Sequence, residues 1–241
     1  MVSERIAQSL NLQPQSRVLE VGPGMGALTK FLLSAQLKVV EIDKESVLYL
    51  QLHYPQLAAH IIQSDFLKLR LSEVFEEETF SLCGNFPYNI SSQIVFHALE
   101  YRQNIPQMAG MFQKEVAERL AASPGSKVYG ILSVLLQAYY DVEYLFTVEA
   151  YDFQPPPKVQ SGVILARKHQ RFPFAETAYP ELKALVKQAF NQRRKTLRNA
   201  LKGYVEQQLL EELQFAGLRA EQLSVQDFVK LAEAVSHSKT V

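Results

Sequence analysis

The residues Gly84 to Asn89, which read Gly-Asn-Phe-Pro-Tyr-Asn, combine side chains that could hold a planar substrate bearing an amine. Asn85 offers an amide carbonyl and an NH2 group. Pro87 fixes its own φ and disfavours the helical conformation for the residue before it, so the turn is predicted to be stiff. Phe86 and Tyr88 offer flat faces on which a nucleobase could stack. The alternative is an ordinary tight turn, with Tyr88 covering the core.

The place of this turn in the chain also indicates a ligand site. It follows an apolar run over residues 80–83 that is typical of a strand, and apolar residues at helical spacing follow over 94–99. Open α/β sheets bind their ligands at the carboxyl ends of strands, so the turn is predicted to lie at such an end.

A second candidate site is a glycine-rich loop. Residues 17–21 form a short β-type run that opens into Gly22-Pro23-Gly24-Met25-Gly26, and helical spacing follows over 28–33. A strand, a glycine loop and a helix bring backbone close to a bound cofactor. The glycine spacing differs from the dinucleotide pattern, and Glu20 stands two residues before the first glycine. Such a loop suits a cofactor without a pyrophosphate, which favours S-adenosylmethionine over NAD.

Acidic residues follow the next two predicted strands. Residues 37–43 are strand-like and contain Glu41 where a second-strand carboxylate binds a ribose diol in nucleotide-binding folds. Residues 59–63 read as a third strand, and Asp65 and Phe66 after it could bind an adenine amine and pack on its ring. The alternatives are a solvated strand end for Glu41 and a helix cap for Asp65.

The remainder of the first 167 residues continues an alternation of strands and helices. We expect helices over 45–57, 113–120 and 129–140, and strands over 108–112, 142–148 and 162–166. Between the last two strands, the run from Phe153 to Val159 contains three consecutive prolines, which predicts a stiff extended loop that presents Phe153. The alternative is a rigid connector with Phe153 in the core.

From about residue 168 the pattern contains only helices, predicted over 179–203, 205–215 and 224–235 after a linker at 171–174. We therefore expect two domains, residues 1–167 and residues 168–241. The first of these helices contains a run of cations without an acid, namely Arg193, Arg194, Lys195, Arg198 and Lys202. A basic run is often a solvated helix face, but its concentration in a neutral chain favours contacts with nucleic-acid phosphates.

Composition narrows the class of protein. The chain carries 25 Lys and Arg against 25 Asp and Glu, so its net charge alone argues against a nucleic-acid partner. The single cysteine, Cys83, excludes an internal disulfide, and the five histidines lack ligand spacing, so we expect no metal. Because no apolar run reaches about 20 residues and the start lacks a signal-peptide pattern, we expect a cytoplasmic protein with no membrane partner.

Several segments together resemble a known family. The chain contains, in this order between Val18 and Val235, the segments VLEVGPGMGALT, VVEID, SDFL, GNFPYNISS, FQPPPKVQSG and AFNQRRKTLRNAL. They are similar to the ribosomal RNA adenine dimethyltransferases, and within them to the bacterial small-subunit enzymes. The resemblance implies a Rossmann-like class I methyltransferase fold, a seven-stranded mixed sheet with flanking helices, plus a small C-terminal helical domain. It also implies an enzyme that uses S-adenosylmethionine to dimethylate N6 of two adjacent adenosines near the 3′ end of small-subunit ribosomal RNA.

The resemblance assigns a cofactor site to residues already named. The set is Glu20, Gly22, Gly24, Gly26, Glu41, Ile42, Asp65, Phe66 and Asn85. The loop glycines would hold the methionine end of S-adenosylmethionine, and Glu41 would bind its ribose. Asp65 would bind the adenine amine, with Ile42 and Phe66 packed on the adenine ring.

The resemblance places the methyl acceptor at the Asn-Phe-Pro-Tyr turn. Asn85 and the carbonyl of Pro87 would bind the target amine, and Tyr88 and Phe153 would sandwich the base. The basic run would contact the partner, the small ribosomal subunit with its 16S ribosomal RNA, and we expect a monomer. The family carries a basic arm before the first strand that helps to cover the cofactor. This sequence lacks its Gln-Asn/His-Phe-Leu motif, so we expect a less covered cofactor site.

Other functions fit some of these motifs. A resistance methyltransferase acting on large-subunit RNA shares the catalytic turn, but the segments FQPPPKV and FNQRRKTLRN favour the small-subunit enzyme. A non-catalytic RNA-binding assembly factor could keep the fold, but Asn85, Pro87 and Tyr88 favour retained chemistry. A nicotinamide enzyme is the most remote alternative.

Overall fold

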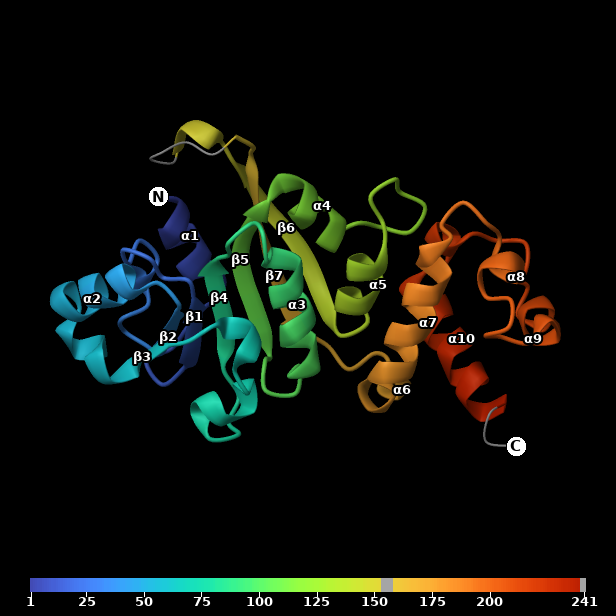
Figure 1. Ribbon diagram of the computed structural model, residues 1–241, viewed down its shortest axis with the longest axis horizontal. Helices are drawn as coiled ribbons and strands as arrows, with labels where there is room; N and C mark the ends of the chain where they lie inside the picture. The colour runs from blue at the N-terminus through green and yellow to red at the C-terminus, as the bar shows by residue number, and fades with distance from the viewer. Residues whose placement is uncertain (153–157, 239–241) are drawn as a thin grey trace. The chain divides into compact units, whose positions relative to one another are not determined.

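The computed structural model describes residues 1–152 and 158–238, which form two compact units (Figure 1). Unit 1 consists of Met1–Ala117 with Val142–Lys168, and unit 2 of Glu118–Asp141 with His169–Val241. This division differs from the predicted one by one residue at the boundary, Lys168, and by a whole segment, residues 118–141. That segment supplies core aromatics to unit 2, since Tyr129 contacts Phe190 edge-on, with ring centroids 6.1 Å apart.

Unit 1 is built around a seven-stranded sheet with the order β3-β2-β1-β4-β5-β7-β6 (Figure 1). The strands are β1 (Arg17–Val21), β2 (Gln36–Glu41), β3 (Ile61–Gln63), β4 (Ser81–Asn85), β5 (Gln107–Gln113), β6 (Tyr140–Val148) and β7 (Ser161–Lys168). Strands β1 to β5 pair in parallel, and β7 runs antiparallel to β5. The predicted mixed sheet is confirmed. Its central strands are almost entirely buried, as expected for parallel strands covered on both faces.

Helices and short 3-10 turns connect these strands. The helices are α1 (Val2–Ser9), α2 (Lys44–His53), α3 (Ser91–Glu100) and α4 (Lys114–Leu120), and the 3-10 turns are η1 (Thr29–Phe31), η2 (Pro55–His60), η3 (Phe66–Lys68), η4 (Leu71–Phe75) and η5 (Ala150–Asp152). The helix predicted over 28–33 is wrong, because only η1 forms there among successive turns. Leu28 and Leu32 are nevertheless buried, so the turns satisfy the same apolar spacing.

The strand order reverses between β1 and β4. From β1 the chain continues outward through β2 and β3, whereas β4 begins the other half of the sheet. The two strands are in register, with Glu20 opposite Cys83, so the loop after β1 and the turn after β4 lie at the same edge. Such a reversal is where open α/β sheets bind ligands.

Unit 2 is helical in its described part, with α5 (Ile131–Gln137), α6 (Pro173–Thr177), α7 (Tyr179–Asn191), α8 (Leu197–Ala200), α9 (Gln207–Glu212), η6 (Ala220–Gln222) and α10 (Val225–Ser238). The rings of Phe190 and Phe228 stack in its core. The prediction of one helix over 179–203 is wrong. The chain leaves the helix after Asn191 because Thr196 pairs with Arg219 and the Leu197 N–H donates to the Leu218 carbonyl at 2.7 Å.

Candidate cofactor and substrate site

A cavity of about 700 Å³ lies at the carboxyl ends of β1 and β4, and Met111 of β5 and Val148 of β6 also line it. Its lining includes Glu20, Gly22 and Gly24 from the first strand and its loop, and Asn85 from the end of β4. Residues that were predicted from separate motifs are therefore gathered around one space. The other predicted cofactor residues lie at or just after the ends of β1, β2 and β3: Gly26 in the loop after β1, Glu41 as the last residue of β2 with Ile42 next to it, and Asp65 and Phe66 at the start of η3.

Helix α1 forms a wall of this cavity that sequence reasoning missed. Met1, Val2, Ser3, Arg5 and Ile6 all line it. The Ile6 side chain is 1% exposed, and the Arg5 guanidinium lies 3.4 Å from the centroid of the Phe146 ring. The helical spacing of Val2, Ile6 and Leu10 indicates only an amphipathic helix, not the surface that it covers.

The glycine loop depends on packing as well as on access for a ligand. Gly26 has φ +80°, and a Cβ there would lie 2.5 Å from the Tyr54 ring, whose hydroxyl donates to the Gly26 carbonyl at 3.2 Å. At Gly24, with φ +52°, a Cβ would meet nothing within 4 Å. The space beside Gly24 is therefore open, whereas Gly26 is required for contact with the segment after α2.

The carboxylate of Glu41 holds the glycine loop. One oxygen accepts a hydrogen bond from the Gly24 N–H at 3.1 Å, and the other accepts from the N–H groups of Ile42 and Asp43 at 2.8 and 3.0 Å. A carboxylate has about four acceptor positions, so about one remains for a ligand hydroxyl. Glu41 is 8% exposed, which agrees with an acceptor at the edge of a site and not with a solvated strand end.

The second acid of the site, Glu20, is buried to 1% exposure and accepts a hydrogen bond from the Thr29 hydroxyl at 2.7 Å. Its pKa is raised to about 8, chiefly by burial and also by the negative charge of Glu41, although the Thr29 hydrogen bond lowers it. A carboxyl group in such a place gains most from a cationic partner. The part of the cavity beside Glu20 therefore suits a ligand with an ammonium group, such as the methionine end of S-adenosylmethionine.

The loops after β2 and β3 are joined by a hydrogen bond from the Ser64 N–H to the Glu41 carbonyl at 3.0 Å. Asp65 caps η3 by accepting from the Leu67 N–H at 3.0 Å, so the alternative of a helix cap is part of its role. Phe66 is 4% exposed, whereas Ile42 is 67% exposed. An exposed isoleucine beside a carboxylate provides an apolar surface of the kind on which an adenine ring can pack.

The turn over residues 84–89 divides its residues between the core and the cavity. Phe86 is 1% exposed, its N–H donates to the Met111 carbonyl at 3.1 Å, and its ring lies 4.9 Å from that of Phe112. The prediction that Phe86 offers a stacking face is therefore wrong. Its ring packs over Gly84 and Gly110, which have no side chains to fill that space. Phe86 anchors the turn, while Asn85 is exposed at the cavity.

Pro87 and Tyr88 complete the turn. The Pro87 ring is 3.7 Å from the position that a Cβ on Gly22 would occupy, so the turn and the glycine loop are adjacent. The Pro87 carbonyl accepts from the Ile90 N–H at 3.1 Å and keeps a second lone pair. Tyr88 is half-buried, with its hydroxyl 2.5 Å from that of Ser161. Phe153, the other predicted aromatic, lies outside the described residues.

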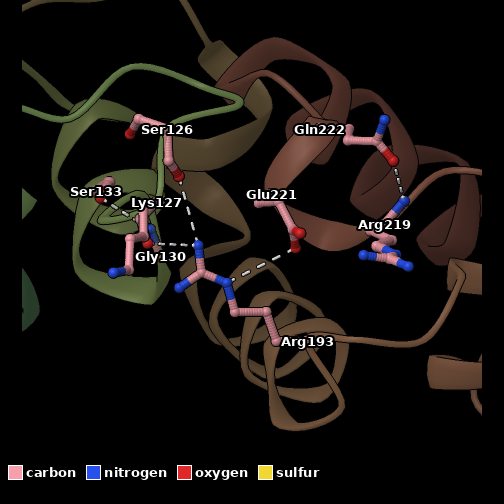
Figure 2. Close-up of polar contacts among 8 residues, drawn as sticks. All are labelled: Ser126, Lys127, Gly130, Ser133, Arg193, Arg219, Glu221 and Gln222. Carbon is pink, nitrogen blue, oxygen red and sulfur yellow. Dashed lines mark hydrogen bonds and ion pairs between the residues drawn. The ribbon is translucent and has the colours of Figure 1, made fainter.

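The predicted basic run divides into bound and exposed cations. Figure 2 shows the Arg193 guanidinium between the carbonyls of Ser126 and Lys127, at 3.4 and 2.8 Å, and the Glu221 carboxylate, 3.8 Å from Nε. Arg198 donates to Glu211 at 3.0 Å. Arg198 is itself exposed, as are Arg194, Lys195 and Lys202.

The described residues also limit other kinds of site. Within residues 1–152 and 158–238, no three His, Cys, Asp or Glu side chains gather in a way that could hold a metal ion. In the same residues, no helix is long and apolar enough to span a membrane.

The seven-stranded sheet, with a cavity at its switch point, has the Rossmann-like fold of class I methyltransferases. The chain belongs to the ribosomal RNA adenine dimethylase family, whose model matches residues 1–237. It is 51% identical to the ribosomal RNA small subunit methyltransferase A of Flavobacterium johnsoniae, over 97% of this chain and 90% of that protein. Its identity to the protein of the same name from Parabacteroides distasonis is 53%, over 95% and 87% of the two chains.

Two solved structures share the whole fold. The dimethyladenosine transferase from Plasmodium falciparum matches with a TM-score of 0.84 and 23% identity, over 99% of this chain and 96% of that one. The 23S rRNA methyltransferase ErmE matches with a TM-score of 0.73 and 23% identity, over 98% and 97%. At these identities the likeness establishes the fold and not the substrate.

Proposed function

We propose that this protein transfers methyl groups from S-adenosylmethionine to N6 of two adjacent adenosines near the 3′ end of small-subunit ribosomal RNA. The observation that carries the proposal is the cavity that Asn85 shares with the glycine loop, in a member of an adenine dimethylase family. The named relatives at 51 and 53% identity act on the small subunit by their titles, which favours it over the large subunit.

The residues present fit the proposed cofactor. The open space beside Gly22 and Gly24 would hold its methionine end next to the buried Glu20 carboxyl, because the N–H groups of both glycines already donate to the Val40 carbonyl and the Glu41 carboxylate. The remaining acceptor position of Glu41 would take a ribose hydroxyl, and Asp65 with Ile42 would take the adenine. When bound, S-adenosylmethionine supplies a methyl group on a positively charged sulfur, which is a good leaving group.

The turn residues would prepare the target amine. An adenine amine is a poor nucleophile because its lone pair is delocalised into the ring. The Asn85 side-chain carbonyl and the Pro87 carbonyl would accept hydrogen bonds from the two N–H groups of the amine. These contacts would draw the nitrogen toward tetrahedral geometry and point its lone pair at the methyl carbon. Orientation of this kind can supply much of a rate enhancement without a strong base. Tyr88 would hold the base by stacking once it has left its own stack.

The partner in this reaction would be the small ribosomal subunit with its 16S ribosomal RNA. The protein would bind it as a monomer in the cytoplasm. The exposed cations Arg194, Lys195 and Lys202 would contact phosphates, with Arg193 and Arg198 contributing positive charge around them. Phosphate contacts of this kind give affinity that depends on salt concentration.

Incubation of the protein with labelled S-adenosylmethionine and unmethylated ribosomal subunits tests the proposal. We expect label in small subunits, recovered after nuclease digestion as N6,N6-dimethyladenosine, and none above background in large subunits. Label in large subunits alone would identify a large-subunit enzyme instead. Tight binding to small subunits without label would support a non-catalytic assembly factor.

A further inference from the structure

The contact between the hydroxyl groups of Tyr88 and Ser161 joins the catalytic turn to the far half of the sheet. The two oxygens are 2.5 Å apart, although 73 positions separate the residues in the chain. Ser161 is the first residue of β7 and is 0% exposed. Because β7 is antiparallel to β5, this end of β7 lies at the same edge of the sheet as the carboxyl ends of β4 and β5.

The backbone around Ser161 has little freedom to move. Ser161 pairs with Gln113 in the sheet, and a Cβ on the following Gly162 would lie 2.7 Å from the Ala117 Cβ and 2.8 Å from the Tyr144 ring. On the preceding side, the Gln160 amide donates to both oxygens of Glu149 at 2.8 Å. The Ser161 hydroxyl is therefore presented from a fixed position.

Tyr88 is constrained at its backbone and at its hydroxyl. The Tyr88 carbonyl accepts from the Ser91 hydroxyl at 3.2 Å, which ties the backbone to the start of α3. Within the part of the chain that the structure describes, the Ser161 hydroxyl has one hydrogen-bond partner, the Tyr88 hydroxyl. Burial of an unpaired hydroxyl is costly, so the pair resists separation.

We propose that Ser161 is a positioning residue that fixes the ring of Tyr88 in the orientation that the target base meets. This inference rests on the proposed function, in which Tyr88 stacks on the adenine. Ser161 does not touch the substrate in this scheme. Its contribution is to hold the Tyr88 ring in place before the base binds, which reduces the conformational entropy that the Tyr88 side chain loses on binding.

The test compares Ser161→Ala, Tyr88→Phe, the double variant and Tyr88→Ala in steady-state methylation of small subunits. Tyr88→Phe removes the contact and keeps the ring, so it tests the proposal even if Ser161→Ala folds poorly. Ser81→Ala is the matched control, because Ser81 is a buried serine that accepts from the Gln107 amide at 2.9 Å at the opposite edge of the sheet. Affinity for S-adenosylmethionine is measured for every variant by calorimetry.

We expect Ser161→Ala and Tyr88→Phe each to lower kcat/KM for the subunit by about 3- to 10-fold, the range for one hydrogen bond. The double variant should lose no more than either single variant, and the affinity for S-adenosylmethionine should stay unchanged. Tyr88→Ala should lose more, and Ser81→Ala should keep wild-type kcat/KM. Wild-type kcat/KM in both Ser161→Ala and Tyr88→Phe would overturn the proposal, as would fully additive losses. No methylation by the wild-type protein would instead overturn the proposed function, and this inference with it.

Discussion

The Glu41 carboxylate accepts a hydrogen bond from the Gly24 N–H at 3.1 Å, which ties the end of β2 to the glycine loop that follows β1. The two residues belong to motifs that each suggest a nucleotide-type ligand. Their contact means that the loop conformation and the proposed ribose acceptor depend on one side chain. A substitution at Glu41 should therefore disturb the conformation of the loop at residues 22–26, including the part of the loop that Glu41 does not contact.

Substitution of Glu41 by alanine should weaken S-adenosylmethionine binding by at least about tenfold, because it removes an acceptor for the ligand and releases the Gly24 N–H. Calorimetry measures the affinity, and amide hydrogen exchange should show faster exchange in residues 22–26. Asp43→Ala is the control, since Asp43 accepts from the Ser46 N–H at 2.7 Å and caps α2 without a contact to the loop. Wild-type affinity in Glu41→Ala would contradict the assigned role.

Stability should depend on pH through Glu20. Its pKa of about 8 in the folded protein lies above the ordinary value of 4.5, so between these values the unfolded chain binds fewer protons. The free energy of unfolding contributed by Glu20 therefore falls as pH rises through this window. Glu20→Gln keeps an acceptor for Thr29 and cannot ionise, so its melting temperature should exceed that of wild type by a margin that grows from about pH 5 to about pH 8.

Differential scanning calorimetry at several pH values measures that margin. Glu45→Gln, a change at an exposed glutamate of α2, serves as the control and should show no such trend. A constant difference between Glu20→Gln and wild type across the window would show that Glu20 is ionised throughout.

Asn85→Ala should lower the rate of methyl transfer by about 100-fold or more, because orientation of the target amine is lost. The melting temperature should change little, since Asn85 is exposed, and much of the affinity for small subunits should remain. Asn89→Ala changes another exposed asparagine of the same turn and should keep most activity. Near-normal turnover by Asn85→Ala in a single-turnover assay would refute its role.

Gly110→Ala should destabilise the protein by about 1–3 kcal/mol, the usual range for overpacking. The added Cβ would lie 2.2 Å from the Phe86 ring and 2.8 Å from the Gly84 carbonyl oxygen. Phe86→Leu in the same chain should restore part of the loss by removing the ring. Gly217→Ala is the matched control, because a Cβ there meets nothing within 4 Å. Urea denaturation measures each variant, and an additive double variant would argue against a contact between these two side chains.

Arg193 and Arg194 should behave differently despite their adjacency. Arg193→Met should destabilise the protein by about 1–3 kcal/mol and speed amide exchange in residues 123–127, because it removes charged hydrogen bonds to that loop. Arg194→Met should leave stability unchanged. It should make the slope of log affinity for small subunits against log salt concentration shallower by about one. Equal melting temperatures with equal losses of slope would show that both arginines contact phosphates.

The sequence alone supports the fold class and part of the candidate site. Alternating strands and helices, a glycine loop and an Asn-Phe-Pro-Tyr turn are local patterns, because backbone conformation and burial period are properties of neighbouring residues. The seven-stranded mixed sheet agrees with those patterns. Glu20, Gly22, Gly24 and Asn85 line one cavity as expected, since motifs at the carboxyl ends of parallel strands share one edge.

The tertiary structure decided which residues of each motif are buried in the core and which line the cavity. It placed Phe86 in the core, α1 in the cavity wall and Arg193 against the loop at residues 126–127, and it grouped residues 118–141 with the C-terminal helices. In place of the one helix predicted over 179–203, the structure has two, α7 and α8. Each outcome depends on contacts between residues far apart in the chain, such as Phe86 with Gly110 or Thr196 with Arg219. Local periodicity carries no information about such partners, so only the folded chain determines them.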